Sequence, residues 1–135
     1  MAKKIQSIEG IGPGYAEMLV GAGISSTERL LQEGATREGR TALAQKTGIN
    51  ERLILKWVNM SDLFRIRGVA GQYAELLEAA GVDTVKELRN RNPENLAQAM
   101  IAANKEKRLV RQTPSQKRVS DWVDHAKNLP PVVSY

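Results

Sequence analysis

Two short glycine-rich stretches are the part of the sequence best suited to bind a ligand. The first, IEGIGPGYAEML, covers residues 8–19 and carries Gly10, Gly12 and Gly14 at alternate positions just before a helical pattern. Glycine permits the positive φ of a tight turn, and it leaves the first N–H groups of the following helix uncovered. Those N–H groups and the positive end of the helix dipole can bind an anionic oxygen. The alternative is that the glycines serve only the turn.

The second stretch, IRGVAGQYAELL, covers residues 66–77 and repeats the first with changes at the turn. Ala70 stands where the first stretch has Gly12. A methyl group at the point of closest approach is expected to strain the turn or to block an incoming oxygen. Arg65 and Arg67 flank this turn, so it could bind an anion through side chains instead. The other interpretation, which we favour slightly, is that this copy is purely structural.

Both stretches belong to an internal repeat. With an offset of 58, residues 8–31 align on residues 66–89 with nine identities in 24 positions. Farther along, the offset becomes 65 and Trp57 aligns on Trp122. Because a repeated sequence indicates a repeated structural unit, we expect three segments: a first unit at 1–62, a second unit at 63–129 and a C-terminal tail at 130–135.

The composition and the local signals predict an all-α fold. Ala, Leu, Glu, Lys, Arg and Gln dominate, and no segment alternates as a strand does. The tyrosines and tryptophans at matched positions are interpreted as packing residues: Tyr15, Tyr73, Trp57 and Trp122. Helix-capping residues are expected at matched positions as well, with Gly23 and Gly81 as C-terminal caps and Ser25…Glu28 and Thr84…Glu87 as capping boxes.

Basic residues are concentrated in one part of the chain. Lys and Arg number 20 against 15 Asp and Glu, yet residues 1–85 are net neutral and residues 86–118 carry a net charge of +6. A clustered excess of this kind can attract a polyanion, although a solvated helix surface would look the same. The stretch NKEKRLVRQTPSQKR at 104–118 is the best candidate basic patch.

Several function classes are disfavoured by composition. The chain has no cysteine and one histidine, which removes disulfides, thiolate catalysis and cysteine-based zinc sites. His125 and the nearby Asp121 and Asp124 form no recognisable catalytic pattern and are assigned no chemistry. No apolar run reaches 18 residues. We therefore expect a cytoplasmic protein without enzymatic activity, cofactor, metal, membrane contact or small-molecule substrate.

The first stretch resembles the helix-hairpin-helix motif of DNA ligases, repair nucleases, polymerases and DNA-uptake proteins. The resemblance is carried by Ile8, Gly10, Ile11, Gly12, Ala16 and Leu19. In that motif the bound anion is a nucleic-acid phosphate, and such contacts hold the backbone without reading bases. The resemblance implies phosphate binding by the first hairpin, while some copies of the motif bind protein or nothing.

Nearly the whole chain, residues 5–133, resembles an uncharacterised bacterial family that carries two helix-hairpin-helix units and is classed as a domain of unknown function. The matching phrases are IEGIGPGYAEMLVGAGI, SDLFRIRGVAGQYAELLEAAGVDTVKELRNRNPENL and PSQKRVSDWVDHAKNLPPV. This resemblance implies two tandem helix-hairpin-helix-led units that pack as one pseudo-symmetric domain. It implies no established activity.

We therefore expect a module that binds DNA through its phosphate backbone without sequence specificity. The alternative is a protein-interaction or scaffold module that has the fold but no nucleic-acid site. The candidate nucleic-acid-binding residues are Gly10, Ile11, Gly12, Gly14, Arg65, Arg67, Gly68, Val69, Gly71, Lys105, Lys107, Arg108, Arg111 and Lys117.

Overall fold

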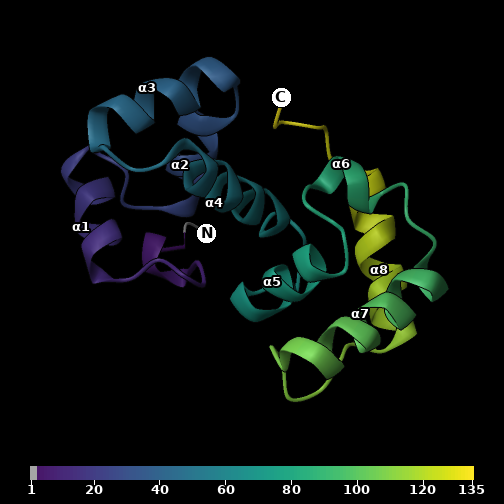
Figure 1. Cartoon of the computed structure of the whole chain (residues 1–135). Helices are drawn as coiled ribbons and strands as arrows, with labels where there is room; N and C mark the ends of the chain where they lie inside the picture. Colours follow the sequence, from purple (N-terminus) through teal and green to yellow (C-terminus); the bar gives the residue numbers. More distant parts are fainter. Residues whose placement is uncertain (1–2) are drawn as a thin grey trace. The chain divides into compact units, whose positions relative to one another are not determined.

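The structure is a computed structural model that describes residues 3–135, and it confirms the all-α prediction (Figure 1). In the described part of the chain the regular elements are helices, with one isolated bridge between Lys4 and Ser26. None of the described helices is long and apolar enough to cross a membrane. The elements in order are η1 (Ile5–Ser7), α1 (Pro13–Gly21), α2 (Thr27–Gly34), α3 (Arg37–Thr47), α4 (Glu51–Leu63), α5 (Gly71–Ala79), α6 (Val85–Leu88), α7 (Pro93–Lys107) and α8 (Gln116–Lys127).

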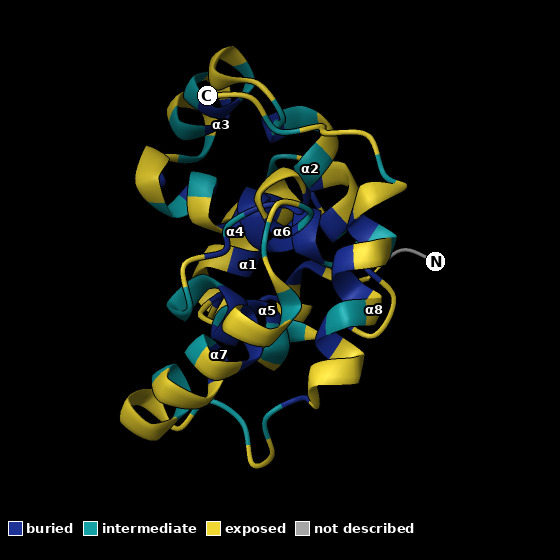
Figure 2. Ribbon diagram, turned by 90° about the vertical axis from the view of Figure 1, so that its right-hand side faces the viewer, coloured by how far each residue is buried: buried dark blue, intermediate teal, exposed yellow. Residues whose placement is uncertain are grey.

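The chain divides into two compact units. Unit 1 runs to Asp62 and also takes in the C-terminal residues Val132–Tyr135, whereas unit 2 spans Leu63–Pro131. Within each unit the helices bury one side and expose the other (Figure 2). Amphipathic helices of this length gain most of their stability from that packing.

Unit 1 is built on α1 to α4. Its buried apolar side chains come from all four helices and from the segment before α1, and they include Ile8, Leu19, Leu30, Leu43 and Ile54. α2 approaches α4 closely because Gly34 has no side chain: a Cβ atom there would lie 2.5 Å from a methyl group of Val58.

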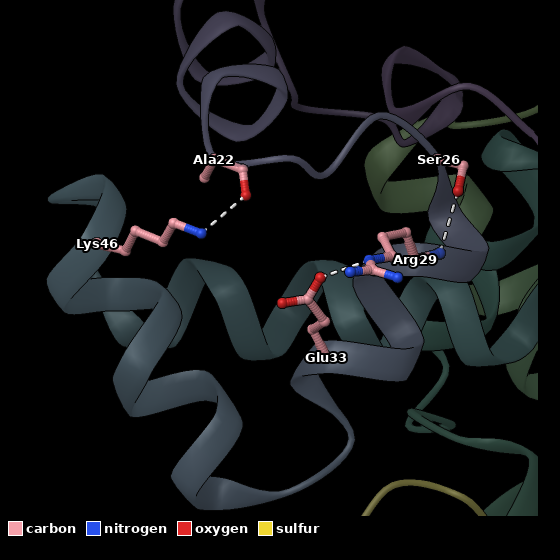
Figure 3. A network of polar contacts seen from close by, with 5 residues as sticks. All are labelled: Ala22, Ser26, Arg29, Glu33 and Lys46. Atoms are coloured by element: carbon pink, nitrogen blue, oxygen red, sulfur yellow. Dashed lines mark hydrogen bonds and ion pairs between the residues drawn. The ribbon is translucent and has the colours of Figure 1, made fainter.

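Two polar contacts fix the ends of the unit 1 helices (Figure 3). Lys46, in the last turn of α3, donates from its Nζ to the carbonyl oxygen of Ala22 at 3.1 Å, just past the end of α1. A cation at this place complements the negative end of the α1 dipole. At the start of α2, the backbone N–H of Arg29 donates to the hydroxyl oxygen of Ser26 at 3.1 Å. Ser26 is therefore the N-cap, and the predicted capping position at Ser25 is one residue too early.

The C-terminal residues of unit 1 are docked onto a buried arginine. Arg40 is 3% exposed and donates to the carbonyl oxygens of Gly34, Ala35 and Ser134 at 2.9, 3.1 and 2.7 Å. The backbone N–H of Ser134 in turn donates to the carbonyl of Ala35 at 2.8 Å. The guanidinium thus covers the C-terminal carbonyls of α2 and holds the last residues in place.

Unit 2 is built on α5 to α8. Helices α7 and α8 pack against each other, and they also contact α5 and α6 respectively. The core includes Leu77, Leu88, Met100 and Trp122, each at most 2% exposed. Thr84, Asn92 and Ser115 cap the starts of α6, α7 and α8, and the cap at Thr84 was predicted from the sequence.

The two units repeat the same local geometry at the hairpin. Gly10 has φ +91° and Gly68 has φ +89°, a conformation that glycine adopts without strain. In both turns the residue after the glycine donates its backbone N–H three residues back, to Ile8 in unit 1 and to Ile66 in unit 2. The expected C-terminal caps at Gly23 and Gly81 also have positive φ, which confirms them.

Candidate functional site

The hairpin of unit 1, residues 8–14, leaves its backbone open. A Cβ atom built on Gly10, Gly12 or Gly14 meets no atom within 4 Å. Pro13 is the first residue of α1 and has no N–H, and the N–H groups of Gly12, Gly14 and Tyr15 donate to no acceptor in the described residues. Ile11 is 9% exposed and holds the turn from inside. Three N–H donors therefore face solvent at the positive end of α1, where an anionic oxygen can reach them.

The side chains around this hairpin supply little positive charge. Glu9 and Glu17 are exposed there, and Lys4 on the preceding segment is the nearest described cation in sequence. Tyr15, Met18 and Val20 on α1 are exposed by 38–49%. An anion bound at this hairpin would be held by backbone dipoles rather than by basic side chains.

The hairpin of unit 2, residues 66–72, has the same backbone and different surroundings. Ala70 lies at φ −102° and ψ 179°, extended backbone that any residue adopts, so the strain expected from its methyl group is absent. Gly71 begins α5, and Val69 is 2% exposed. A Cβ atom on Gly68 would lie 3.3 Å from Nε1 of Trp122 and 3.7 Å from a guanidinium nitrogen of Arg118.

The two arginines predicted to flank the second hairpin differ in their contacts. One Nη of Arg65 donates to the carbonyl of Pro130 at 2.8 Å, so this side chain is engaged within unit 2. Arg67 is exposed, and it donates its backbone N–H to Nδ1 of His125 at 3.1 Å. Its guanidinium makes no hydrogen bond or ion pair in the described part of the chain and lines a cavity beside the hairpin.

The predicted basic stretch lies at the end of α7, in the following loop and at the start of α8. Arg108 ends α7 with φ +49°, and the loop is held by paired hydrogen bonds of 3.0 Å between Asn104 and Val110. The five predicted cations are all exposed, and among the described residues their side chains make no ion pair: Lys105, Lys107, Arg108, Arg111 and Lys117. These five belong to unit 2, and the open hairpin belongs to unit 1.

The structure places Arg118 and His125, neither of which was among the predicted site residues, beside the second hairpin. Arg118 stacks on Tyr73 and Trp122, with its Cζ 4.9 and 5.5 Å from their ring centroids, and it lines the cavity together with His125. The repeat alignment contained a signal for them. Arg118 and His125 stand where the first copy has Leu53 and Met60, so the second copy is polar at positions that are apolar in the first.

The matched aromatic residues pack inside their own units. Tyr15 and Trp57 have ring centroids 5.2 Å apart in unit 1, and Tyr73 and Trp122 have centroids 5.6 Å apart in unit 2. Both tryptophans are 2% exposed, which fits their interpretation as core residues.

Comparison with known proteins gives one match. No curated protein and no solved structure matches the chain. A family model described as a domain of unknown function (DUF4332) matches residues 9–129, which includes the second hairpin, the basic stretch and all of the first hairpin except Ile8. That range covers most of the 135 residues and confirms the predicted resemblance to an uncharacterised family. The chain therefore belongs to the DUF4332 family.

Proposed function

We propose that the protein is a DNA-binding module that contacts the phosphate backbone without reading sequence. The supporting observation is the open start of α1: within residues 3–135, the N–H groups of Gly12, Gly14 and Tyr15 have no acceptor and no side chain covers the glycines. A phosphate oxygen is an acceptor that such a helix start can bind. The resemblance to helix-hairpin-helix motifs points the same way.

The second contribution comes from the exposed cations of unit 2. This unit carries twelve Lys and Arg against eight Asp and Glu, whereas unit 1 carries eight against seven. Exposed cations without internal partners are free to neutralise phosphates and to steer a polyanion. Because both the hairpin N–H groups and the cations contact phosphate rather than bases, we expect a DNA affinity that depends steeply on salt concentration and weakly on base sequence. The cysteine-free chain suits the reducing cytoplasm as its place of action.

The test of the hairpin is a duplex titration with Gly12→Val at several salt concentrations. Gly12 has φ −80° and free space at its Cβ position, so valine can fit without strain and still obstruct the N–H groups beside it. We expect affinity about tenfold lower or more, because hydrogen bonds to charged groups are among the strong ones. Gly21→Val is the matched control: Gly21 ends the same helix, also in open space. Equal affinities of both variants and wild type would refute the hairpin's role.

The basic patch is tested by replacing Lys105, Lys107 and Arg108 together with glutamine. If each of them neutralises one phosphate, the slope of log affinity against log salt becomes shallower by up to about 0.9 for each cation. An unchanged slope would show that these three side chains make no phosphate contact. Circular dichroism of the variant checks that its helices remain.

A second candidate function has its own observation. Beside the unit 1 hairpin there is a hollow of about 490 Å³, and exposed apolar side chains lie on the same helix. The hollow is lined by Gln6, Ile11, Pro13, Ala16, Glu17 and Val20. Such a surface suits a protein partner better than a polyanion. Absence of duplex binding by the wild-type protein at low salt would favour this scaffold role.

A further inference from the structure

Unit 2 contains a polar cavity of about 440 Å³ between the second hairpin and helix α8. It is distinct from the open hairpin of unit 1, and it shares one residue, Arg118, with the basic stretch at 104–118. Six residues line it: Arg67, Gly68, Arg118, Asp121, Trp122 and His125. A volume of this order accommodates a small phosphorylated molecule or one nucleotide.

The Arg118 guanidinium is held in place with donor capacity left over. It stacks on Tyr73 and Trp122, which fixes its plane. Its two hydrogen bonds, to the hydroxyl of Tyr73 and to the carbonyl of Gly68, are long at 3.4 and 3.5 Å. A guanidinium has five N–H donors, and bonds of this length are weak. Arg118 can therefore turn its remaining donors to an anion at small conformational cost.

Trp122 and His125 add neutral donors to the same cavity. Nε1 of Trp122 lies beside Gly68 and has no acceptor in the described part of the chain. No fully buried side-chain nitrogen or oxygen there lacks a partner, so this N–H keeps access to solvent. In His125, Nδ1 accepts the backbone N–H of Arg67, which leaves Nε2 as the N–H donor of the neutral ring. With the Arg67 guanidinium, four side chains offer donors to one space.

We infer that this cavity binds a phosphate group through side chains. Two guanidinium groups, an indole N–H and an imidazole N–H suit an acceptor with several oxygens and more than one negative charge. Glycine at position 68 keeps the cavity open, because a Cβ atom there would lie 3.3 Å from the indole nitrogen and enter the cavity. Asp121 is the one acidic residue of the lining, and its charge opposes the bound anion.

The inference does not depend on the hairpin of unit 1, since none of the lining residues belongs to that unit. Two of them, Arg67 and Gly68, are also among the residues predicted to bind nucleic acid. The phosphate could come from a nucleic-acid end, from a phosphodiester backbone or from a free small phosphate. These sources share the chemistry that the cavity recognises, and they differ in what is attached to the phosphate.

The experiment is an NMR titration of the full chain with inorganic phosphate, read at the indole N–H signals. The chain has two tryptophans, so Trp122 reports on the cavity and Trp57 in unit 1 is an internal control. We expect a saturable shift of the Trp122 signal and a constant Trp57 signal. No saturable shift of Trp122, or equal shifts of both signals, would overturn the inference.

Three variants separate the cavity from general charge. Arg118→Gln should weaken phosphate binding about tenfold or more. Lys127→Gln removes the same charge from an exposed residue of the same helix that does not line the cavity, and it should change binding less than twofold. Asp121→Asn should strengthen binding, a gain that misfolding cannot produce. Equal losses for Arg118→Gln and Lys127→Gln, or a loss for Asp121→Asn, would contradict the assignment.

Oligonucleotides then identify the source of the phosphate. If the Trp122 signal shifts more with a 5′-phosphorylated strand than with its 5′-hydroxyl form, the cavity binds a terminal phosphate. If the two strands give equal shifts, it binds a backbone phosphate. Shifts with adenosine monophosphate but with neither strand would identify a free small molecule. Gly12→Val should leave the Trp122 response to inorganic phosphate unchanged. The duplex titration therefore tests the hairpin of unit 1, and the Trp122 signal independently tests the cavity of unit 2.

Discussion

We expect the replacement of Arg40 to destabilise unit 1 strongly, although its place in the sequence suggests an exposed side chain. It sits in the polar phrase REGRTAL, yet it is 3% exposed and its hydrogen-bond partners are carbonyl oxygens. We consider Arg40→Met, which keeps an unbranched side chain and removes the guanidinium. The bond to Gly34 is buried, whereas those to Ala35 and Ser134 are partly buried and can be replaced by water.

The magnitude follows from these three bonds. A buried carbonyl that loses its partner costs about 1–3 kcal/mol, and hydrogen bonds to a charged donor contribute more than neutral ones. The two partly buried carbonyls regain water and add about 1 kcal/mol together. We therefore expect Arg40→Met to lower the free energy of unfolding of unit 1 by about 2–4 kcal/mol. Arg37→Met on the same helix is the control, because Arg37 is exposed and its replacement should cost less than about 0.5 kcal/mol.

The assay is a urea titration followed at the two indole N–H signals, which report on the two units separately. The Trp57 transition should move to lower urea in Arg40→Met. A loss below about 1 kcal/mol, or no larger than that of Arg37→Met, would refute the view that a buried guanidinium stabilises the end of α2.

The remaining predictions concern the turns. Gly10→Ala should lower the free energy of unfolding by about 1–2 kcal/mol, because an alanine is strained at φ +91°. Gly12→Ala, at φ −80°, should change it by under about 0.5 kcal/mol. Urea unfolding measures both. Equal losses would show that the turn does not depend on a positive φ. Ser26→Ala should lower the free energy of unfolding by about 1 kcal/mol, because α2 loses its N-cap, and Ser25→Ala should lower it much less. A larger loss for Ser25→Ala would show that Ser25 is the N-cap, as the sequence predicted.

The hairpin geometry was accessible from the sequence because its causes are local. A repeated glycine at positions 10 and 68 predicts a positive φ in both copies, and both have it. The caps at Thr84 and Ser115 depend on one side chain and a backbone N–H three residues away. Pattern analysis detects such short-range relations well.

The contacts that the sequence analysis missed link residues far apart in the chain. Arg40 reaches Ser134 across 94 residues and Arg118 reaches Gly68 across 50 residues, and no pattern in the sequence pairs these positions. Helix propensity and hydrophobic periodicity describe the helix to which a residue belongs. They do not predict which distant carbonyl or ring the end of a long side chain contacts. The N-cap at Ser26 was missed for a smaller reason. Ser25 and Ser26 are adjacent and both can cap, and the bridge between Lys4 and Ser26 sets the register.

The two proposed anion sites are built on hairpins with nearly the same backbone and different surroundings. Gly10 and Gly68 have nearly the same φ, and α1 and α5 each span nine residues, so the repeat has kept the turn. In unit 1 the turn is bare and its helix carries exposed apolar side chains, which leaves backbone N–H groups as the donors. In unit 2 the same turn borders Arg118 and Trp122, which add side-chain donors. Backbone donors persist through most substitutions, whereas side-chain donors are lost with a single one. Point mutations should therefore abolish binding more readily in the cavity of unit 2 than at the hairpin of unit 1.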